Sequence, residues 1–260
     1  MFKFNETSPR KCWLIGHRGA MGHAPENTLA SFICGQKLGA DMLECDIHLS
    51  KDKKCVVMHD ESVERTTNGH GQIRNLTSSK IKKLDAGSWY SKKYVGERAL
   101  LLEELLDWIK EQKSCLGRAL GLAIEIKNEP IRYLDIEKVA IEIVKKKKME
   151  SRIIFISFDH GVVKRAKSLE PNIPTGILYR EPLADPFKRA KELGADAIFP
   201  RRHLITKSLV QNAHKHKLFV VAWTVNEVKE MKKIFTIGTD AIATNFPDRL
   251  NRVLSNAVKR

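Results

Sequence analysis

The stretch Leu193-Gly194-Ala195-Asp196-Ala197-Ile198-Phe199 joins the end of a helical pattern to a short apolar run. A glycine directly after a helix adopts the left-handed conformation at low cost, so the chain can turn straight into a strand. The same junction recurs as Leu38-Gly39-Ala40-Asp41 and as Ile237-Gly238-Thr239-Asp240. Three junctions of one kind indicate a chain in which helices alternate with strands.

Eight strands of this alternating pattern are predicted, at residues 12–17, 42–49, 122–127, 153–157, 175–179, 197–199, 219–224 and 241–244. Helical patterns lie between them, among others at 28–38, 103–111, 135–147, 183–193 and 206–216. Regular alternation favours parallel strands joined by crossover helices. An open doubly wound sheet is the alternative, but the chain has no glycine-rich phosphate loop. We therefore expect an α/β fold, a (β/α)8 TIM barrel that forms one domain over residues 1–260.

Two features distort this barrel. The apolar run Cys55-Val56-Val57-Met58-His59 follows the second strand after only four residues, too few for a parallel crossover. It is predicted to return as an antiparallel hairpin, and a turn centred on Asp52-Lys53 would pair residue 50 with residue 55 and place Asp46 opposite His59. Residues 61–118 are predicted to be an insertion over the barrel mouth that could shape substrate entry.

Composition limits the function classes. The chain has 260 residues, 42% of them hydrophobic and 30% charged, as in soluble globular proteins, and its five cysteines show no metal-binding spacing. The net charge of +15 would suit nucleic acid, an anionic membrane surface or a phosphate-bearing substrate. Because the basic residues are spread along the chain, we interpret them as a solvated surface. With no signal-peptide pattern and no long apolar run, we expect a cytoplasmic protein without stable membrane insertion.

Polar residues gather where the predicted strands end, which is where barrels of this kind hold their reacting groups. The first strand ends in His17-Arg18, the second carries Glu44 and Asp46 on one face, the hairpin ends in His59, and the third strand ends in Glu125-Ile126-Lys127.

Three carboxylates in one barrel mouth repel each other unless a cation neutralises them, and oxygen ligands favour Mg²⁺ or Ca²⁺. Two histidines beside them offer a general base and a general acid. Arg18 and Lys127 supply the positive charge that a reacting phosphodiester needs, although Glu125 and Lys127 could also be a simple ion pair.

These residues stand in a longer pattern that resembles the glycerophosphodiester phosphodiesterase family. The matching segments run from about residue 14 to about residue 250 and are Ile15-Gly16-His17-Arg18-Gly19, Ala24-Pro25-Glu26-Asn27-Thr28, Glu44-Cys45-Asp46, His59-Asp60, Arg65-Thr66-Thr67-Asn68-Gly69, Leu84-Asp85-Ala86-Gly87, Glu125-Ile126-Lys127, Ser157-Phe158 and Trp223-Thr224-Val225-Asn226. One departure is Ala99-Leu100-Leu101-Leu102, where the family usually carries proline and threonine before a glutamate pair.

The resemblance implies a role for each matching position. It implies metal ligands at Glu44, Asp46 and Glu125, acid–base histidines at His17 and His59, and phosphate-binding bases at Arg18 and Lys127. Trp223 matches an aromatic residue of the pocket wall that packs on the glycerol group, and the alternative is an interior barrel residue without ligand contact. Asn27 is interpreted as a helix N-cap, and His48 as a residue at the rim of the site that does not bind the metal.

The implied reaction is metal-dependent hydrolysis of a small glycerophosphodiester to sn-glycerol 3-phosphate and an alcohol. We expect His17 to deprotonate the nucleophile, either water or the substrate's own glycerol hydroxyl, and His59 to protonate the departing alcohol. Three alternatives stay open: a lysophospholipase D, a phosphatidylinositol-specific phospholipase C that stops at a cyclic phosphate, and a basic nucleic-acid or membrane-binding module without catalysis. The predicted partner is the small-molecule substrate and not nucleic acid.

Overall fold

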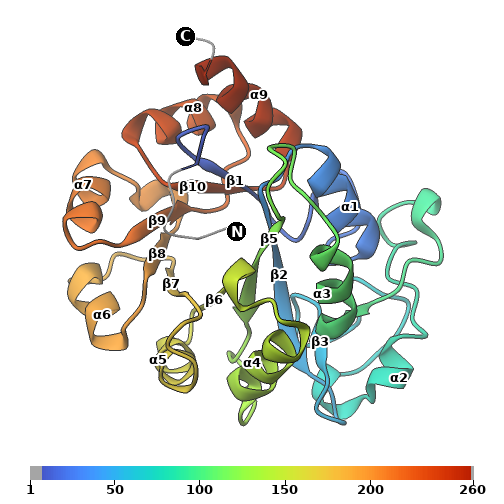
Figure 1. Ribbon diagram of the computed structural model, residues 1–260. Coiled ribbons are helices and arrows are strands. Elements are labelled where there is room, and N and C mark those ends of the chain that lie inside the picture. Colours follow the sequence, from blue (N-terminus) through green and yellow to red (C-terminus); the bar gives the residue numbers. More distant parts are fainter. Residues whose placement is uncertain (1–7, 259–260) are drawn as a thin grey trace.

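Parallel strands close into a barrel in the computed structural model, which describes residues 8–258 (Figure 1). Their order around the barrel is β1, β2, β5, β6, β7, β8, β9, β10, and β1 pairs with both β2 and β10, so the ring is closed. The bounds of these strands are β1 Trp13–Gly16, β2 Met42–Leu49, β5 Gly121–Ile126, β6 Ile153–Ser157, β7 Thr175–Tyr179, β8 Ala197–Pro200, β9 Phe219–Ala222 and β10 Ala241–Thr244. The prediction of a (β/α)8 barrel is confirmed.

Helices surround the barrel in Figure 1 and connect its successive strands. In the described part of the chain they are α1 Leu29–Lys37, α2 Ser78–Ile81, α3 Leu102–Lys110, α4 Ile136–Lys147, α5 His160–Leu169, α6 Pro186–Leu193, α7 Lys207–Lys215, α8 Val228–Ile237 and α9 Pro247–Val258, with short 3-10 turns η1 Ile73–Asn75, η2 Lys92–Tyr94, η3 Glu150–Arg152 and η4 Arg202–Leu204.

The three helix-to-strand junctions have the predicted geometry, because Gly39, Gly194 and Gly238 all have positive φ angles. The aspartate two residues after each glycine adds a contact that the sequence did not reveal. Its carboxylate accepts a hydrogen bond from the backbone N–H of the preceding strand of the barrel: Asp41 from Leu14, Asp196 from Thr175 and Asp240 from Val220, at 2.8–3.0 Å. Each junction therefore ties the start of one strand to the start of the next.

The hairpin after β2 is antiparallel, as predicted, but its register differs by one residue. Strand β3, Cys55–Val57, pairs His48 with Val56 and Leu49 with Cys55, so Asp46 lies beside Met58 and not opposite His59. The reason is the turn: Lys53 takes a left-handed φ of 59°, and Ser50 and Lys54 close a loop of three residues. The sequence prediction assumed a two-residue turn, and the three-residue turn of the structure shifts the pairing by one residue.

Residues 61–118 contain η1, α2, η2, the short strand β4 at Leu100–Leu101, and α3. Strand β4 pairs with β3, and a small apolar cluster packs Val63, Ile73 and Ile81 of this region together with Val56 and Met58 from the hairpin. In Figure 1 much of this segment, drawn in teal, projects from one side of the barrel. The expectation that it shapes substrate entry stays a prediction.

Apolar side chains fill two layers of the barrel. The larger layer lies between the strands and the helices, and the smaller one fills the barrel interior with Trp13, Ile15, Met42, Ala123 and others. Alternate residues of β1, β2 and β5 point inward, apolar at the start of each strand and polar toward its end. The interior therefore changes from a packed core to a polar site along the barrel axis.

Candidate active site

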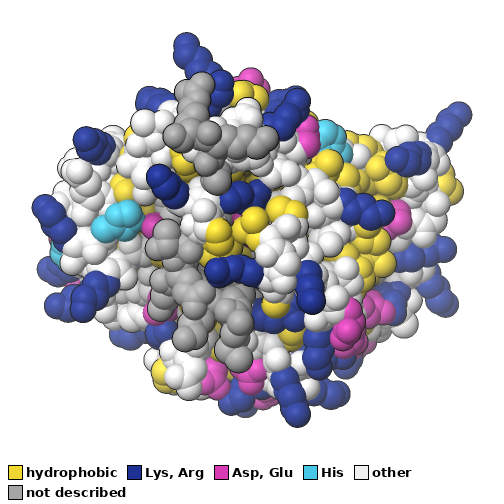
Figure 2. Space-filling model, turned by 45° about the horizontal axis from the view of Figure 1, so that its top comes forward, with side chains coloured by type: hydrophobic (Ala, Val, Ile, Leu, Met, Phe, Trp, Pro, Cys, Tyr) yellow, Lys and Arg dark blue, Asp and Glu magenta, His cyan; other side chains and the backbone are white. Residues whose placement is uncertain are grey.

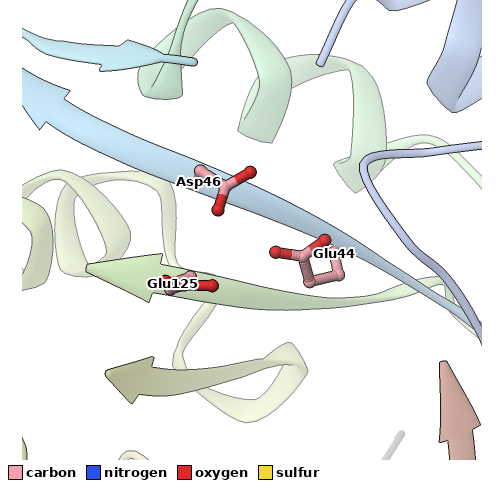
Figure 3. Close-up of side chains that lie close together, drawn as sticks. All are labelled: Glu44, Asp46 and Glu125. Carbon is pink, nitrogen blue, oxygen red and sulfur yellow. The ribbon is translucent and has the colours of Figure 1, made fainter. Parts of the chain in front are cut away.

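Three carboxylates lie together at the polar end of the barrel. Ligand oxygens of Glu44 and Asp46, from β2, and of Glu125, from β5, all lie within 4.8 Å of one another (Figure 3). All three side chains are buried. Burial, together with the charges of Asp46 and Glu125, raises the pKa of Glu44, and burial and Asp46 also raise the pKa of Glu125 against the opposing effect of Lys127. The cluster carries more negative charge than its surroundings neutralise.

Two basic side chains partly compensate this charge. Nζ of Lys127 lies 2.5 Å from Glu125 and 3.0 Å from Asp46, and Nε of Arg18 lies 3.4 Å from Asp46. Burial alone would raise the pKa of Asp46, but Lys127 and Arg18 bring it well below the usual range. Asp46 is therefore the most firmly ionised of the three carboxylates.

Arg18 is fixed by both its backbone and its side chain. Its φ of 48° lies in the left-handed region, and its N–H donates to Glu44 at 2.8 Å. Its guanidinium donates to Glu26 at 2.8 Å, and Glu26 also accepts two hydrogen bonds from Arg65. Glu26, only 4% exposed, thus holds two arginines behind the site.

The two histidines have different partners on Nδ1. His17 Nδ1 lies 2.7 Å from Oδ1 of Asn245, whereas His59 Nδ1 lies 2.6 Å from the Asp60 carboxylate, which Arg65 also binds. Nε2 of His17 lies 3.9 Å from Glu44. Burial and the positive charge of Arg18 lower the pKa of His17 to about 3, so this ring is neutral at physiological pH. One histidine faces an amide and the other an ionised partner, which suits opposite roles in proton transfer.

A cavity of about 310 Å³ opens beside these groups, a volume typical of small-molecule sites. Phe158 and Trp223 lie in its wall with their ring centroids 5.4 Å apart, and Nε1 of Trp223 donates to the Phe199 carbonyl at 2.6 Å. Other lining residues are His17, Arg18, Glu44, His59, Glu125, Lys127, Arg180, Arg201, Arg202 and Thr224.

Seven of the eight residues selected from the sequence therefore line one cavity, and the eighth, Asp46, lies fully buried behind them. The interpretation of Asn27 as an N-cap is wrong. Thr28 caps α1 by accepting from Ser31, while Asn27 donates to Asp46 at 2.9 Å, because a left-handed φ of 58° turns it away from the helix. His48 contacts the Tyr133 hydroxyl and the His59 carbonyl and lies outside the carboxylate group.

Three residues that support the site, Asn245, Asp60 and Glu26, have no role assigned from the sequence. Asn245 directly follows β10, so the rule that strand ends carry the chemistry could have found it. Asp60 stood next to His59 in the recognised pattern. The contact of Glu26 with Arg65 joins residues 39 positions apart, and no local pattern predicts it.

The donor set fits a hard divalent cation. Three carboxylates offer oxygen ligands, and Oδ1 of Asp46 is buried without a well-aligned hydrogen bond even though Lys127 lies near it. Two bases, one of them shared with Glu26, do not balance the three acids. A cation among these oxygens would remove the remaining repulsion.

Comparisons with known proteins agree with this chemistry. The model of the Glycerophosphoryl diester phosphodiesterase family matches residues 17–249. A glycerophosphodiester phosphodiesterase of Caldanaerobacter subterraneus is 36% identical over 92% of this chain and 96% of its own. A solved structure from Silicibacter pomeroyi, described as a putative glycerophosphoryl diester phosphodiesterase, has a TM-score of 0.87 at 27% identity over 97% of this chain and 96% of its own. An Oleispira antarctica phosphodiesterase, solved with the product sn-glycerol-3-phosphate, has a TM-score of 0.82 at 27% identity over 94% and 96%.

Proposed function

The chain belongs to the Glycerophosphoryl diester phosphodiesterase family and hydrolyses glycerophosphodiesters, and we propose that it does so with His17 and His59 as its acid–base pair. The products are sn-glycerol 3-phosphate, the product bound by the relative from Oleispira antarctica, and the alcohol of the other ester arm. One observation carries the proposal: both histidines, both phosphate-binding bases and two of the three carboxylates line a single cavity.

A divalent cation, Mg²⁺ or Ca²⁺, would be held by Glu44, Asp46 and Glu125. When bound, it supplies positive charge that stabilises the phosphoryl oxygens as negative charge builds on them. Arg18 and Lys127 contribute to the same stabilisation from fixed positions, since each is held by carboxylates within 3.4 Å.

His17 acts as the general base. It is neutral, and Nδ1 can donate to Asn245, which leaves the lone pair of Nε2 to accept a proton from the nucleophile. The nucleophile is either water or the glycerol hydroxyl of the substrate, and the second route passes through a cyclic phosphate that water then opens.

His59 acts as the general acid. Asp60 lies 2.6 Å from its Nδ1 and can hold a proton there, so Nε2 presents the proton that the departing alcohol needs. Arg65 binds the same carboxylate and fixes its orientation. Because the two rings have different partners, His17 is suited to accept a proton and His59 to donate one.

The lysophospholipase D alternative requires space for an acyl chain beside residues 61–118. One cavity that Thr66, Ala86 and Ala99 of this segment line together with Met58 has a volume of only about 10 Å³, too small for an acyl chain. A phospholipase C would differ in its product, because it would release a stable cyclic phosphate.

The test uses metal-free protein with the glycerophosphodiesters of choline, ethanolamine and glycerol, each with and without Mg²⁺ or Ca²⁺. We expect metal-dependent release of sn-glycerol 3-phosphate, lost in His59→Ala and kept in His70→Ala, which changes an exposed histidine outside the cavity. Release of a cyclic phosphate alone would contradict the proposal. So would an enzyme that converts lysophospholipids to lysophosphatidate and does not hydrolyse the deacylated diesters.

A basic binding module without catalysis would instead bind nucleic acid or anionic vesicles with steep salt dependence. On the face shown in Figure 2, Lys and Arg side chains are distributed among other residues and do not form one continuous patch. Between residues 8 and 258, no helix combines the length and hydropathy that crossing a membrane requires. The cytoplasmic location stays a prediction, which fractionation of the producing cells tests.

A further inference from the structure

Two arginines face the site from across the barrel. Arg180 follows β7 and Arg201 follows β8, and both line the cavity that holds the histidines. The parallel pairing of Tyr179 with Pro200 places them at the same level on neighbouring strands. In the ring of strands β8 lies opposite β2, and Figure 1 shows β7 and β8 on the far side of the barrel from β2. This wall is therefore opposite the carboxylates of β2.

In the part of the chain that the structure describes, no ion pair neutralises either guanidinium. Within residues 8–258 no carboxylate pairs with Arg180 or Arg201, whereas the adjacent Arg202 donates to both carboxylate oxygens of Glu230. The guanidinium carbon of Arg180 lies 4.4 Å from the centroid of the Phe158 ring. An arginine that stacks on an aromatic face keeps the N–H groups at its edge free for an anion. The far wall thus combines two available cations with aromatic support.

We propose that Arg180 and Arg201 bind a second anionic group, carried by the alcohol arm of the substrate. The inference rests on the proposed function, because a phosphodiester held between Arg18 and Lys127 extends its two ester arms away from phosphorus. The arm that crosses the cavity reaches Arg180 and Arg201. A carboxylate or a phosphate on that arm meets two guanidinium groups, whereas the cation of a choline arm meets like charge.

The neighbouring cavity is a poorer place for this anion. It shares Arg180 and Phe158 with the first cavity, but Glu129, Asp159 and Glu181 also line it. These carboxylates would repel a second anion. Among residues 8–258, the carboxylates that line the first cavity are Glu44 and Glu125, which belong to β2 and β5 and not to the wall of Arg180 and Arg201.

The test compares two diesters of sn-glycerol 3-phosphate that differ only in charge: the ester of 3-hydroxypropanoate and the ester of its primary amide. With the metal-loaded enzyme we expect kcat/KM for the carboxylate to exceed that for the amide by about tenfold, the scale of one charged hydrogen bond. Raising the ionic strength should reduce this ratio, because the arginines are exposed.

The double variant Arg180→Gln/Arg201→Gln should bring the ratio to within about threefold of one, mainly by loss of activity on the carboxylate. The matched control is Arg132→Gln, which removes an arginine that lines only the neighbouring cavity, and it should leave the ratio unchanged. A wild-type ratio near one, a double variant that keeps the wild-type ratio, or a control that loses it as the double variant does overturns the inference while both diesters are still hydrolysed. Absence of hydrolysis of every diester instead contradicts the proposed function.

Discussion

Replacing Glu44 by glutamine should stabilise the metal-free protein and abolish most of its metal response. The ligand oxygens of the three carboxylates lie within 4.8 Å of one another, and at an effective dielectric constant of ~20 two unit charges at that distance repel by about 3 kcal/mol. Arg18 and Lys127 offset part of this repulsion, so we expect a gain of about 1–2 kcal/mol in the free energy of unfolding. Glutamine keeps an oxygen that accepts the Arg18 N–H.

The sign of the pH dependence follows from the raised pKa of Glu44. The folded protein binds the Glu44 proton more tightly than the unfolded chain does, so ionisation of this residue costs stability at neutral pH. The gain in Glu44→Gln should therefore be present at pH 7.5 and disappear below the ordinary pKa of a glutamate. Asp46→Asn should have the opposite effect without metal, because ionised Asp46 is stabilised by Lys127 and Arg18.

Thermal unfolding with and without Mg²⁺ or Ca²⁺ measures both the stability of the metal-free protein and its response to metal. Without metal the melting temperature of Glu44→Gln should exceed that of the parent by about 2–8 °C. With metal at ~100 times the dissociation constant, the parent should gain about 2.7 kcal/mol and become the more stable protein. A metal-free variant that is less stable than the parent, with an unchanged response to metal, would show that Glu44 neither suffers this repulsion nor holds the metal.

Four further substitutions test the remaining groups. His17→Ala and His59→Ala should each lower kcat by about 10²–10⁴, with a double variant that loses less than the product, and a near-normal rate in steady-state assays would exclude that residue. Lys127→Met should lower kcat/KM at saturating metal, with a loss of about 2–4 kcal/mol in transition-state stabilisation. A decrease in kcat/KM below about threefold would leave Lys127 as an ion-pair partner of Glu125. Asp60→Asn should lower kcat less than His59→Ala and shift the alkaline limb of the pH–rate profile, on which a general acid loses its proton, and an unchanged profile would show that Asp60 does not act through His59.

The sequence was sufficient to predict the barrel and to select residues that lie together in one cavity, because both depend on short-range periodicity. Glu44 and Asp46 are two residues apart on one strand, and Glu125 and Lys127 repeat that spacing, so each pair must share a face. In a barrel of parallel strands, the C-terminal ends of all strands lie on the same face, so the polar residues at these ends come together.

What the sequence missed depends on backbone angles or on distant contacts. The hairpin register required the left-handed φ of Lys53, which lysine seldom adopts. The role of Asn27 likewise depended on a positive φ that points its side chain at Asp46. Asn245 meets His17 across 228 residues, through the pairing of β10 with β1 that closes the barrel.

The aspartates of the three glycine junctions have a consequence for how the chain assembles. Asp41, Asp196 and Asp240 reach amides only 27, 21 and 20 residues earlier, so each contact encloses a strand, its helix and the start of the next strand. Closing so short a segment costs little chain entropy. A strand–helix–strand unit of this kind can form before the rest of the polypeptide has folded. The barrel can then grow by addition of one preformed unit to its neighbour.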